Sequence, residues 1–162
     1  MQKISPCLWF DGNAQEAAEF YISVFPNSRI NNVIMAPASG TPSNEPGSVM
    51  VVEFTLDGED FVGLNGGPHF TFSEAISFQI YLERQDEVDR YWAALTEGGE
   101  PGPCGWLKDR FGLSWQVIPA GMAEIFADPD PARAQRAVQA MLQMTKLDVA
   151  ALRAAADGVP VG

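Results

Sequence analysis

The chain has few of the residues from which disulfide scaffolds, metal sites and membrane spans are built. Its 162 residues include two cysteines, Cys7 and Cys104, and one histidine. The cysteines lack the paired spacing of a zinc site and are too few for a disulfide framework. No run approaches the roughly 20 apolar residues that span a bilayer, and the first ten residues lack the pattern of a signal peptide. We therefore expect a protein of the reducing cytoplasm with no membrane partner.

Basic residues are also scarce, because 10 Lys and Arg stand against 21 Asp and Glu, for a net charge of −11. Residues 1–130 carry 6 basic and 19 acidic side chains, whereas residues 131–162 carry 4 and 2. The acidic residues 1–130 repel the phosphates of nucleic acids, and we therefore expect no nucleic-acid partner. It does not repel a cationic small molecule. The excess of acid would either favour a cationic ligand or only keep the protein soluble, and both interpretations stay open.

A β-hairpin over residues 106–118 organises the rest of the chain. Residues 106–108 and 113–118 predict two strands, the second rich in β-branched and aromatic residues. Between them, Asp109 and Gly112 supply residue types that tolerate a tight turn. The length of the chain fits one domain.

Hydrophobic periodicity predicts the other elements. Asn13 and Glu16 have the spacing of a capping box at the start of a helix over 14–25, and Asp130 and Asp148 are placed to cap two helices of a C-terminal tail. A second central helix is expected over 85–97. The remaining predicted strands cover residues 4–10, 29–36, 48–56, 59–64 and 75–82, and residues 100–119 must supply all the other strands of the second module.

An internal repeat follows from a shift of 71 residues, which places Phe10 on Tyr81, Glu16 on Glu87 and Val24 on Leu95. Each pair keeps its chemical type within a strand–turn–helix unit. We predict an α+β fold of two βαβββ-type modules, residues 1–70 and an abbreviated 71–120, with a helical tail over 121–162. Two such sheets, side by side, would form an open cup.

Several segments resemble the vicinal-oxygen-chelate superfamily, which includes glyoxalases and bleomycin-resistance proteins, and within it the PhnB-like branch described as 3-demethylubiquinone-9 3-methyltransferase-like. The resemblance covers almost the whole chain and implies the cupped fold and a homodimer. The matching segments are residues 8–13 (LWFDGN), 16–21 (EAAEFY), 25–28 (FPNS), 63–68 (GLNGGP), 75–78 (AISF), 104–119 and the tail around 138–148.

Metal enzymes of this superfamily hold a divalent ion with His and Glu side chains, and the resemblance places those positions here on other residues. The histidine positions fall near Ile4 and near Ala75 or Ser77, and the Glu position falls on Gln116. A neutral amide is a poor ligand for such an ion and cannot act as a general base. We therefore expect neither a metal nor another cofactor. The glycines of residues 63–68 are interpreted as a turn between modules, not as a methyl-donor site.

The pattern of polar side chains predicts a ligand-binding face instead. Alternation places Ser77, Gln79 and Tyr81 on one side of a strand, and it groups Ser114 with Gln116 on one side of the hairpin. These groups would either line a ligand pocket or only form hydrogen bonds with one another or with water. Cys7 is interpreted as a core residue and Cys104 as structural. No catalytic residue is assigned, and the partner is an unknown small molecule. The candidate pocket residues are Ser77, Gln79, Tyr81, Trp106, Ser114, Gln116 and His69.

Overall fold

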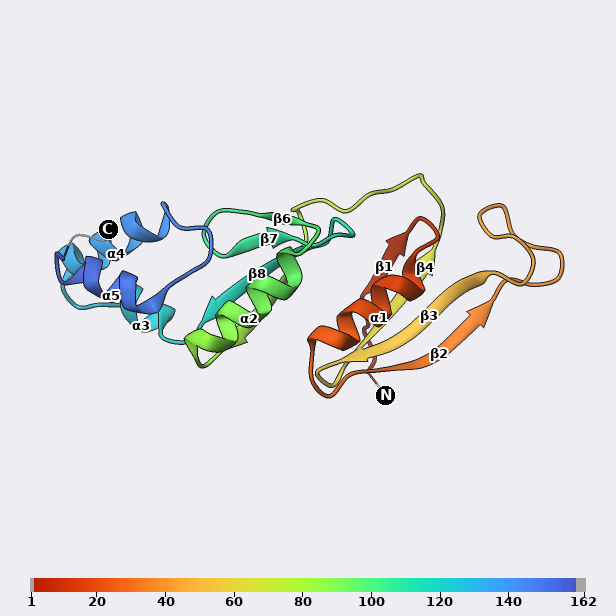
Figure 1. Cartoon of the computed structure of the whole chain (residues 1–162), viewed down its shortest axis with the longest axis horizontal. Helices are drawn as coiled ribbons and strands as arrows, with labels where there is room; N and C mark the ends of the chain where they lie inside the picture. Colours follow the sequence, from red (N-terminus) through yellow and green to blue (C-terminus); the bar gives the residue numbers. More distant parts are fainter. Residues whose placement is uncertain (1, 160–162) are drawn as a thin grey trace. The chain divides into compact units, whose positions relative to one another are not determined.

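The computed structural model describes residues 2–159, and the chain divides into two compact units, residues 1–72 and 73–162. Each unit contains one four-stranded mixed sheet with a helix on one face (Figure 1). Within residues 2–159, no helix has the length and apolar character needed to cross a membrane.

The first unit has the strand order β1-β4-β3-β2, with β1 parallel to β4 and the other neighbours antiparallel. Its helix α1 packs on the sheet through Ala17, Ala18 and Tyr21, and Tyr21 stacks on Phe54 with ring centroids 6.4 Å apart. Apolar residues with helical spacing thus build the core of this unit. Its elements are β1 (Cys7–Phe10), α1 (Ala14–Val24), β2 (Arg29–Met35), β3 (Val49–Leu56) and β4 (Glu59–Asn65).

The second unit repeats this connectivity, with the strand order β5-β8-β7-β6 and β5 parallel to β8. The predicted α+β fold of two βαβββ modules is therefore confirmed. The second module is abbreviated in the length of its strands, since β6 has two residues and β7 has three. Its elements are β5 (Phe78–Leu82), α2 (Gln85–Thr96), β6 (Glu100–Pro101), β7 (Trp106–Lys108) and β8 (Ser114–Pro119).

The predicted shift of 71 residues fits the helices but not the first strands. Helices α1 and α2 begin 71 residues apart, at Ala14 and Gln85. In the strands, however, Phe10 is buried and Tyr81 is 70% exposed. The buried counterpart of Phe10 is Leu82, because β5 and α2 are joined by two residues where β1 and α1 are joined by three.

The tail forms three helices, α3 (Met122–Phe126), α4 (Pro131–Met141) and α5 (Val149–Ala156), around an apolar cluster that includes Leu147 and Leu152. The predicted caps are confirmed. An Asp130 carboxylate oxygen accepts from Ala132 N at 3.0 Å, and one of Asp148 accepts from Ala151 N at 2.9 Å.

Other local predictions were wrong. The Asn13 side chain caps nothing at α1, and Ala14 N donates instead to Asn65 Oδ1 on β4 at 2.9 Å, because the folded sheet brings that amide to the helix start. Cys7 is exposed, since its side chain points to the sheet face opposite the one that carries the buried Leu8 and Phe10. Strands β1 and β5 each begin three residues later than predicted.

Candidate small-molecule site

The sheet of the second unit has one apolar and one polar face. Ile80 and Leu82 on β5, with Val117 on β8, are buried on the side of α2. Because side chains alternate along a strand, the residues between them point to the other face. That polar face carries six of the seven candidate residues, on β5, on β7 and β8, and just before β5.

Four of these candidates form one chain of hydrogen bonds across β5 and β8. Tyr81 Oη donates to Gln79 Oε1 at 2.7 Å, and Gln79 Nε2 donates to Gln116 Oε1 at 3.3 Å. Gln116 Nε2 in turn donates to Ser77 Oγ at 2.8 Å. The alternation of polar residues therefore placed these side chains together correctly, and they do satisfy one another. Gln79 and Tyr81 remain exposed, so the row is a polar surface open to a ligand.

A pocket of about 430 Å³ lies beside this row, over β6, β7 and the start of β8. Trp106 contributes a half-buried ring to its wall, and register places Trp106 opposite Gln116. A cross-strand pair thus joins one residue of the pocket wall to one residue of the polar row. Its lining residues are Glu74, Glu100, Pro101, Gly102, Pro103, Trp106, Leu107, Lys108 and Ser114.

Ser114 is the most unusual member of the lining. Its side chain is 1% exposed, and its hydroxyl has no hydrogen-bond partner among residues 2–159. Buried polar atoms in native proteins are nearly always paired, because an unpaired one costs about 1–3 kcal/mol. Ser114 thus places an unpaired hydroxyl beneath the pocket wall, and a molecule in the pocket can bond it once the side chain or its cover moves.

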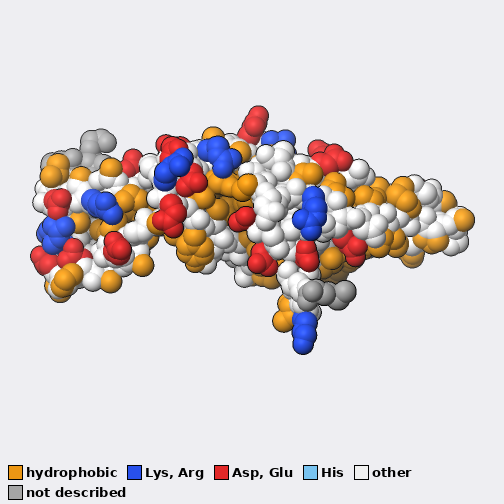
Figure 2. Space-filling model, turned by 90° about the horizontal axis from the view of Figure 1, so that it is seen from below, with side chains coloured by type: hydrophobic (Ala, Val, Ile, Leu, Met, Phe, Trp, Pro, Cys, Tyr) orange, Lys and Arg blue, Asp and Glu red, His pale blue; other side chains and the backbone are white. Residues whose placement is uncertain are grey.

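Charged groups surround the same pocket. Lys108 Nζ forms an ion pair with Glu74 Oε1, and Glu100 lies opposite Lys108 in the β6–β7 register. The hydrogen bond from Lys108 lowers the pKa of Glu74, and the reciprocal bond raises the pKa of Lys108. Two carboxylates thus face one ammonium group around the pocket. Figure 2 shows acidic and basic side chains interspersed over one face of the molecule, and the chain as a whole has 21 Asp and Glu against 10 Lys and Arg.

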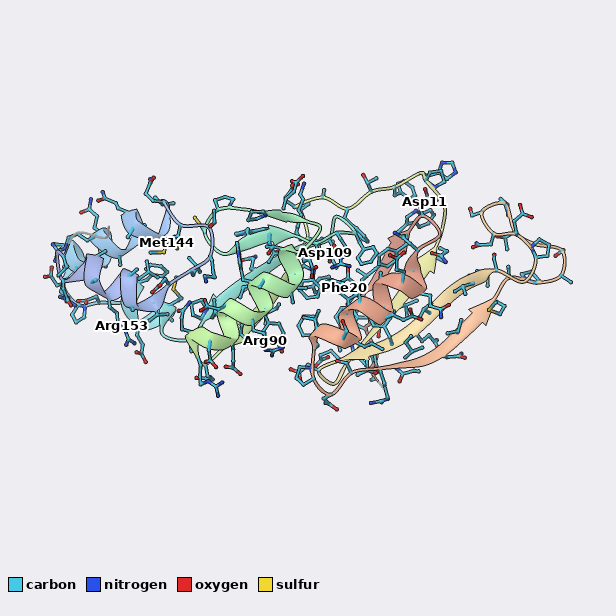
Figure 3. All side chains as sticks on the ribbon, in the orientation of Figure 1. Asp11, Phe20, Arg90, Asp109, Met144 and Arg153 are labelled. Atoms are coloured by element: carbon cyan, nitrogen blue, oxygen red, sulfur yellow. The ribbon has the colours of Figure 1, made fainter. Side chains whose placement is uncertain are left out.

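The hairpin that carries Ser114 is fixed by Asp109, a side chain that the sequence identified only as a turn residue (Figure 3). Asp109 is 3% exposed. Its Oδ1 accepts from Phe111 N at 2.8 Å and from Leu113 N at 3.1 Å, and its Oδ2 accepts from Trp115 Nε1 at 2.8 Å. The sequence signal was an Asp at the first turn position, where the carboxylate can cap the following amides.

The remaining candidates lie elsewhere. His69 is exposed in a turn after β4, in the first unit, and does not line the pocket described above. Cys104 is half-buried, and its thiol donates to Met141 O at 3.6 Å, in agreement with a structural role. Among residues 2–159, no three His, Cys, Asp or Glu side chains are grouped so as to hold a metal ion.

The sequence matches the model of a protein family described as 3-demethylubiquinone-9 3-methyltransferase over residues 2–118. The PhnB protein from Bacillus cereus is 32% identical, with a TM-score of 0.65 over 74% of this chain and 100% of that chain. A protein from Pseudomonas aeruginosa is 22% identical, with a TM-score of 0.58 over 74% and 98% of the two chains.

A more distant match is the fosfomycin resistance protein FosX from Mesorhizobium loti, which is 13% identical, with a TM-score of 0.54 over 78% of this chain and 99% of that chain. At this identity the similarity concerns the fold alone. No curated protein matches the chain.

The paired βαβββ topology and these matches define a protein of the vicinal-oxygen-chelate fold. Within that class, the chain belongs to the PhnB-like family, whose model is described as 3-demethylubiquinone-9 3-methyltransferase.

Proposed function

We propose that this protein binds a small organic molecule in the Ser114 pocket, without a metal ion. The buried, unpartnered hydroxyl of Ser114 is the observation that carries the proposal. A ligand that bonds this hydroxyl recovers a hydrogen bond that folding leaves unmade. The half-buried ring of Trp106 adds an apolar wall, as is usual for a pocket that holds an organic ligand.

The charges around the pocket favour a ligand with one positive charge and a flat apolar body. Glu74 and Glu100 exceed Lys108 by one negative charge at the pocket, and the chain as a whole carries −11. A cation over the face of Trp106 is also attracted by the ring, by about 0.5–1 kcal/mol at an exposed site.

The position of Gln116 supports binding without a metal. By the resemblance described above, Gln116 stands where metal enzymes of this superfamily carry a Glu. Here both ends of its amide are engaged, since Oε1 accepts from Gln79 and Nε2 donates to Ser77. A neutral amide held at both ends in this way is a poor ligand for a divalent ion.

Three molecules of nearly equal shape test the proposal: benzamidine, which is a cation, benzamide, which is neutral, and benzoate, which is an anion. We expect calorimetric affinity to fall in that order. Ser114→Ala should weaken benzamidine binding by about three- to tenfold, the value of one ordinary hydrogen bond. Ser39→Ala changes an exposed hydroxyl in the first unit and is the matched control. Equal binding of the three probes, or full affinity in Ser114→Ala, would contradict the proposal.

The family description favours a second candidate, a methyltransferase that uses S-adenosylmethionine. Calorimetry with S-adenosylmethionine decides this alternative, because tight stoichiometric binding would support it over the first proposal. Metal analysis of the purified protein addresses a metal-dependent lyase, isomerase or dioxygenase. Stoichiometric iron, manganese or zinc would favour that third candidate.

A further inference from the structure

The C-terminal tail begins where the family match ends. The family model matches residues 2–118, and helices α3, α4 and α5 follow from Met122. These helices enclose an apolar cluster of their own, to which Ile118 of β8 and Met144 also pack. The tail is thus a folded addition to the second unit, and its contacts with the sheet indicate what it contributes.

The most specific of these contacts are hydrogen bonds to the pocket wall. Cys104 N donates to Met144 O at 2.9 Å, and Gly105 N donates to Thr145 O at 2.8 Å. Residues 101–103 and Trp106, which flank these two residues on either side, line the Ser114 pocket. The tail therefore holds the middle of the segment that forms the wall. Figure 3 labels Met144 in the stretch that makes these bonds.

Close packing reinforces the same contact. Gly105 has φ +84°, and a Cβ at this position would lie 2.9 Å from Leu147 Cδ1 and 2.9 Å from Val117 O. On the other side, Gly105 O accepts from Val117 N at 2.8 Å. The backbone at Gly105 is thus held between β8 and the tail, and only glycine fits there without displacement.

Gln85 holds the tail backbone just after the two residues that bond to the pocket wall. Its Nε2 donates to Leu147 O at 3.0 Å, and its Oε1 accepts from Val149 N at 3.2 Å. One side chain at the start of α2 therefore satisfies two backbone groups of the tail. An ion pair between Lys146 and Asp89, at 2.7 Å, adds a partly exposed contact with the same helix.

We propose that the tail segment 141–149 positions the 101–106 wall for ligand binding. Gln85 is the positioning residue that holds this segment against α2. The proposal rests on the proposed function of the Ser114 pocket. Gln85 is not among the residues that line the pocket, so its effect on the wall passes along the tail backbone from Leu147 to the carbonyl groups of Met144 and Thr145.

Gln85→Met keeps the size of the side chain and removes its bonds to Leu147 O, Val149 N and Asp89 Oδ1, whereas Gln85→Glu keeps only the acceptor for Val149 N. Gln139→Met changes an exposed glutamine of α4 and is the matched control. Hydrogen exchange reports the wall without any ligand. We expect about tenfold faster exchange at Cys104, Gly105 and Trp106 in Gln85→Met, a smaller change in Gln85→Glu and none in the control.

Benzamidine affinity, measured well below the unfolding temperature, should fall about three- to tenfold in Gln85→Met. Unchanged exchange at Cys104 and Gly105, or faster exchange with unchanged affinity, would overturn the positioning role. If the wild-type protein binds none of the three benzene probes, the pocket function fails. In that case, faster exchange limited to Cys104 and Gly105, with Trp106 unaffected, would overturn the tail proposal as well.

Discussion

At the scale of single residues, Ser114 should show opposite effects on stability and binding. Replacement by alanine removes a buried hydroxyl that has no partner within residues 2–159, and so removes its desolvation cost. We expect Ser114→Ala to raise the free energy of unfolding by about 1 kcal/mol in urea titrations without ligand. A structural serine would show the reverse. Destabilisation of the unliganded protein by this change would therefore argue against a ligand-binding role.

Asp109 should be among the most sensitive side chains of the second unit. Its carboxylate accepts from two backbone amides and the Trp115 indole within a buried turn. Asp109→Ala leaves those donors unpaired, and we expect a loss of about 3 kcal/mol in the free energy of unfolding, measured in urea. Asp11→Ala, at an exposed turn, should cost less than about 0.5 kcal/mol. Similar values for the two variants would refute this account.

The ion pair at the pocket should open in acid. Lys108 lowers the pKa of Glu74 through a hydrogen bond, so the pair is fully formed above the ordinary pKa of a glutamate and is lost as pH falls through the lowered value. At the alkaline end it is lost as pH rises through the raised pKa of Lys108. An NMR titration of the Glu74 carboxyl group should show its pKa return upward in Lys108→Met. A carboxyl pKa that is the same in both proteins would show that the pair does not form in solution.

The sequence was a good guide to the polar row, and of the residues that line the pocket it identified Trp106 and Ser114. Ser77, Gln79 and Gln116 were grouped correctly because a period of two fixes the face on which each side chain lies. Ser114 is 1% exposed, whereas Gln116 on the same face is half-buried, and alternation carries no information about that difference. His69 was included only because of its residue type. It lies in an exposed turn, and residue type alone does not predict where in the fold a side chain lies.

At the scale of elements, the start of α1 offers a matched pair of variants. Asn65 Oδ1 accepts from Ala14 N, and its Nδ2 donates to Val49 O at 2.9 Å. Asn65 is 3% exposed, so Asn65→Ala should cost about 2 kcal/mol in the free energy of unfolding. Asn13→Ala should cost less than about 0.5 kcal/mol, because its side chain makes no capping bond. Thermal unfolding of both variants decides which asparagine supports the helix.

Periodicity identified every long helix and strand, but not the ends that tertiary contacts determine. The caps at Asp130 and Asp148 were predicted because each acceptor lies next to its own helix in sequence. The partner of Ala14 lies 51 residues away on β4, so local sequence pointed to Asn13 instead. For the same reason, the one-residue difference between the two strand–helix connections was invisible until burial distinguished Phe10 from Tyr81.

At the scale of the whole molecule, we propose a homodimer, as the resemblance to the superfamily implied. Strands β1 and β5 are each the terminal strand of a sheet, and such strands are suited to pair with another chain. Light scattering after size-exclusion chromatography should give twice the 17.6 kDa mass of one chain. A mass of one chain across the micromolar range would refute the dimer. The module boundaries at residues 70 and 120 stay predictions.

The parallel pairing that closes each sheet also constrains the order in which the chain can fold. In both units the first strand bonds to the last, β1 to β4 and β5 to β8. During synthesis, Ile80 and Leu82 of β5 must therefore wait for Val117 before their sheet can close. All four strands of the first sheet lie within residues 7–65, so that sheet can close while the second is still being made. Ribosome-bound chains that end before β8 will consequently display an incomplete apolar sheet, and unpaired strand edges of this kind make a folding chain prone to aggregate.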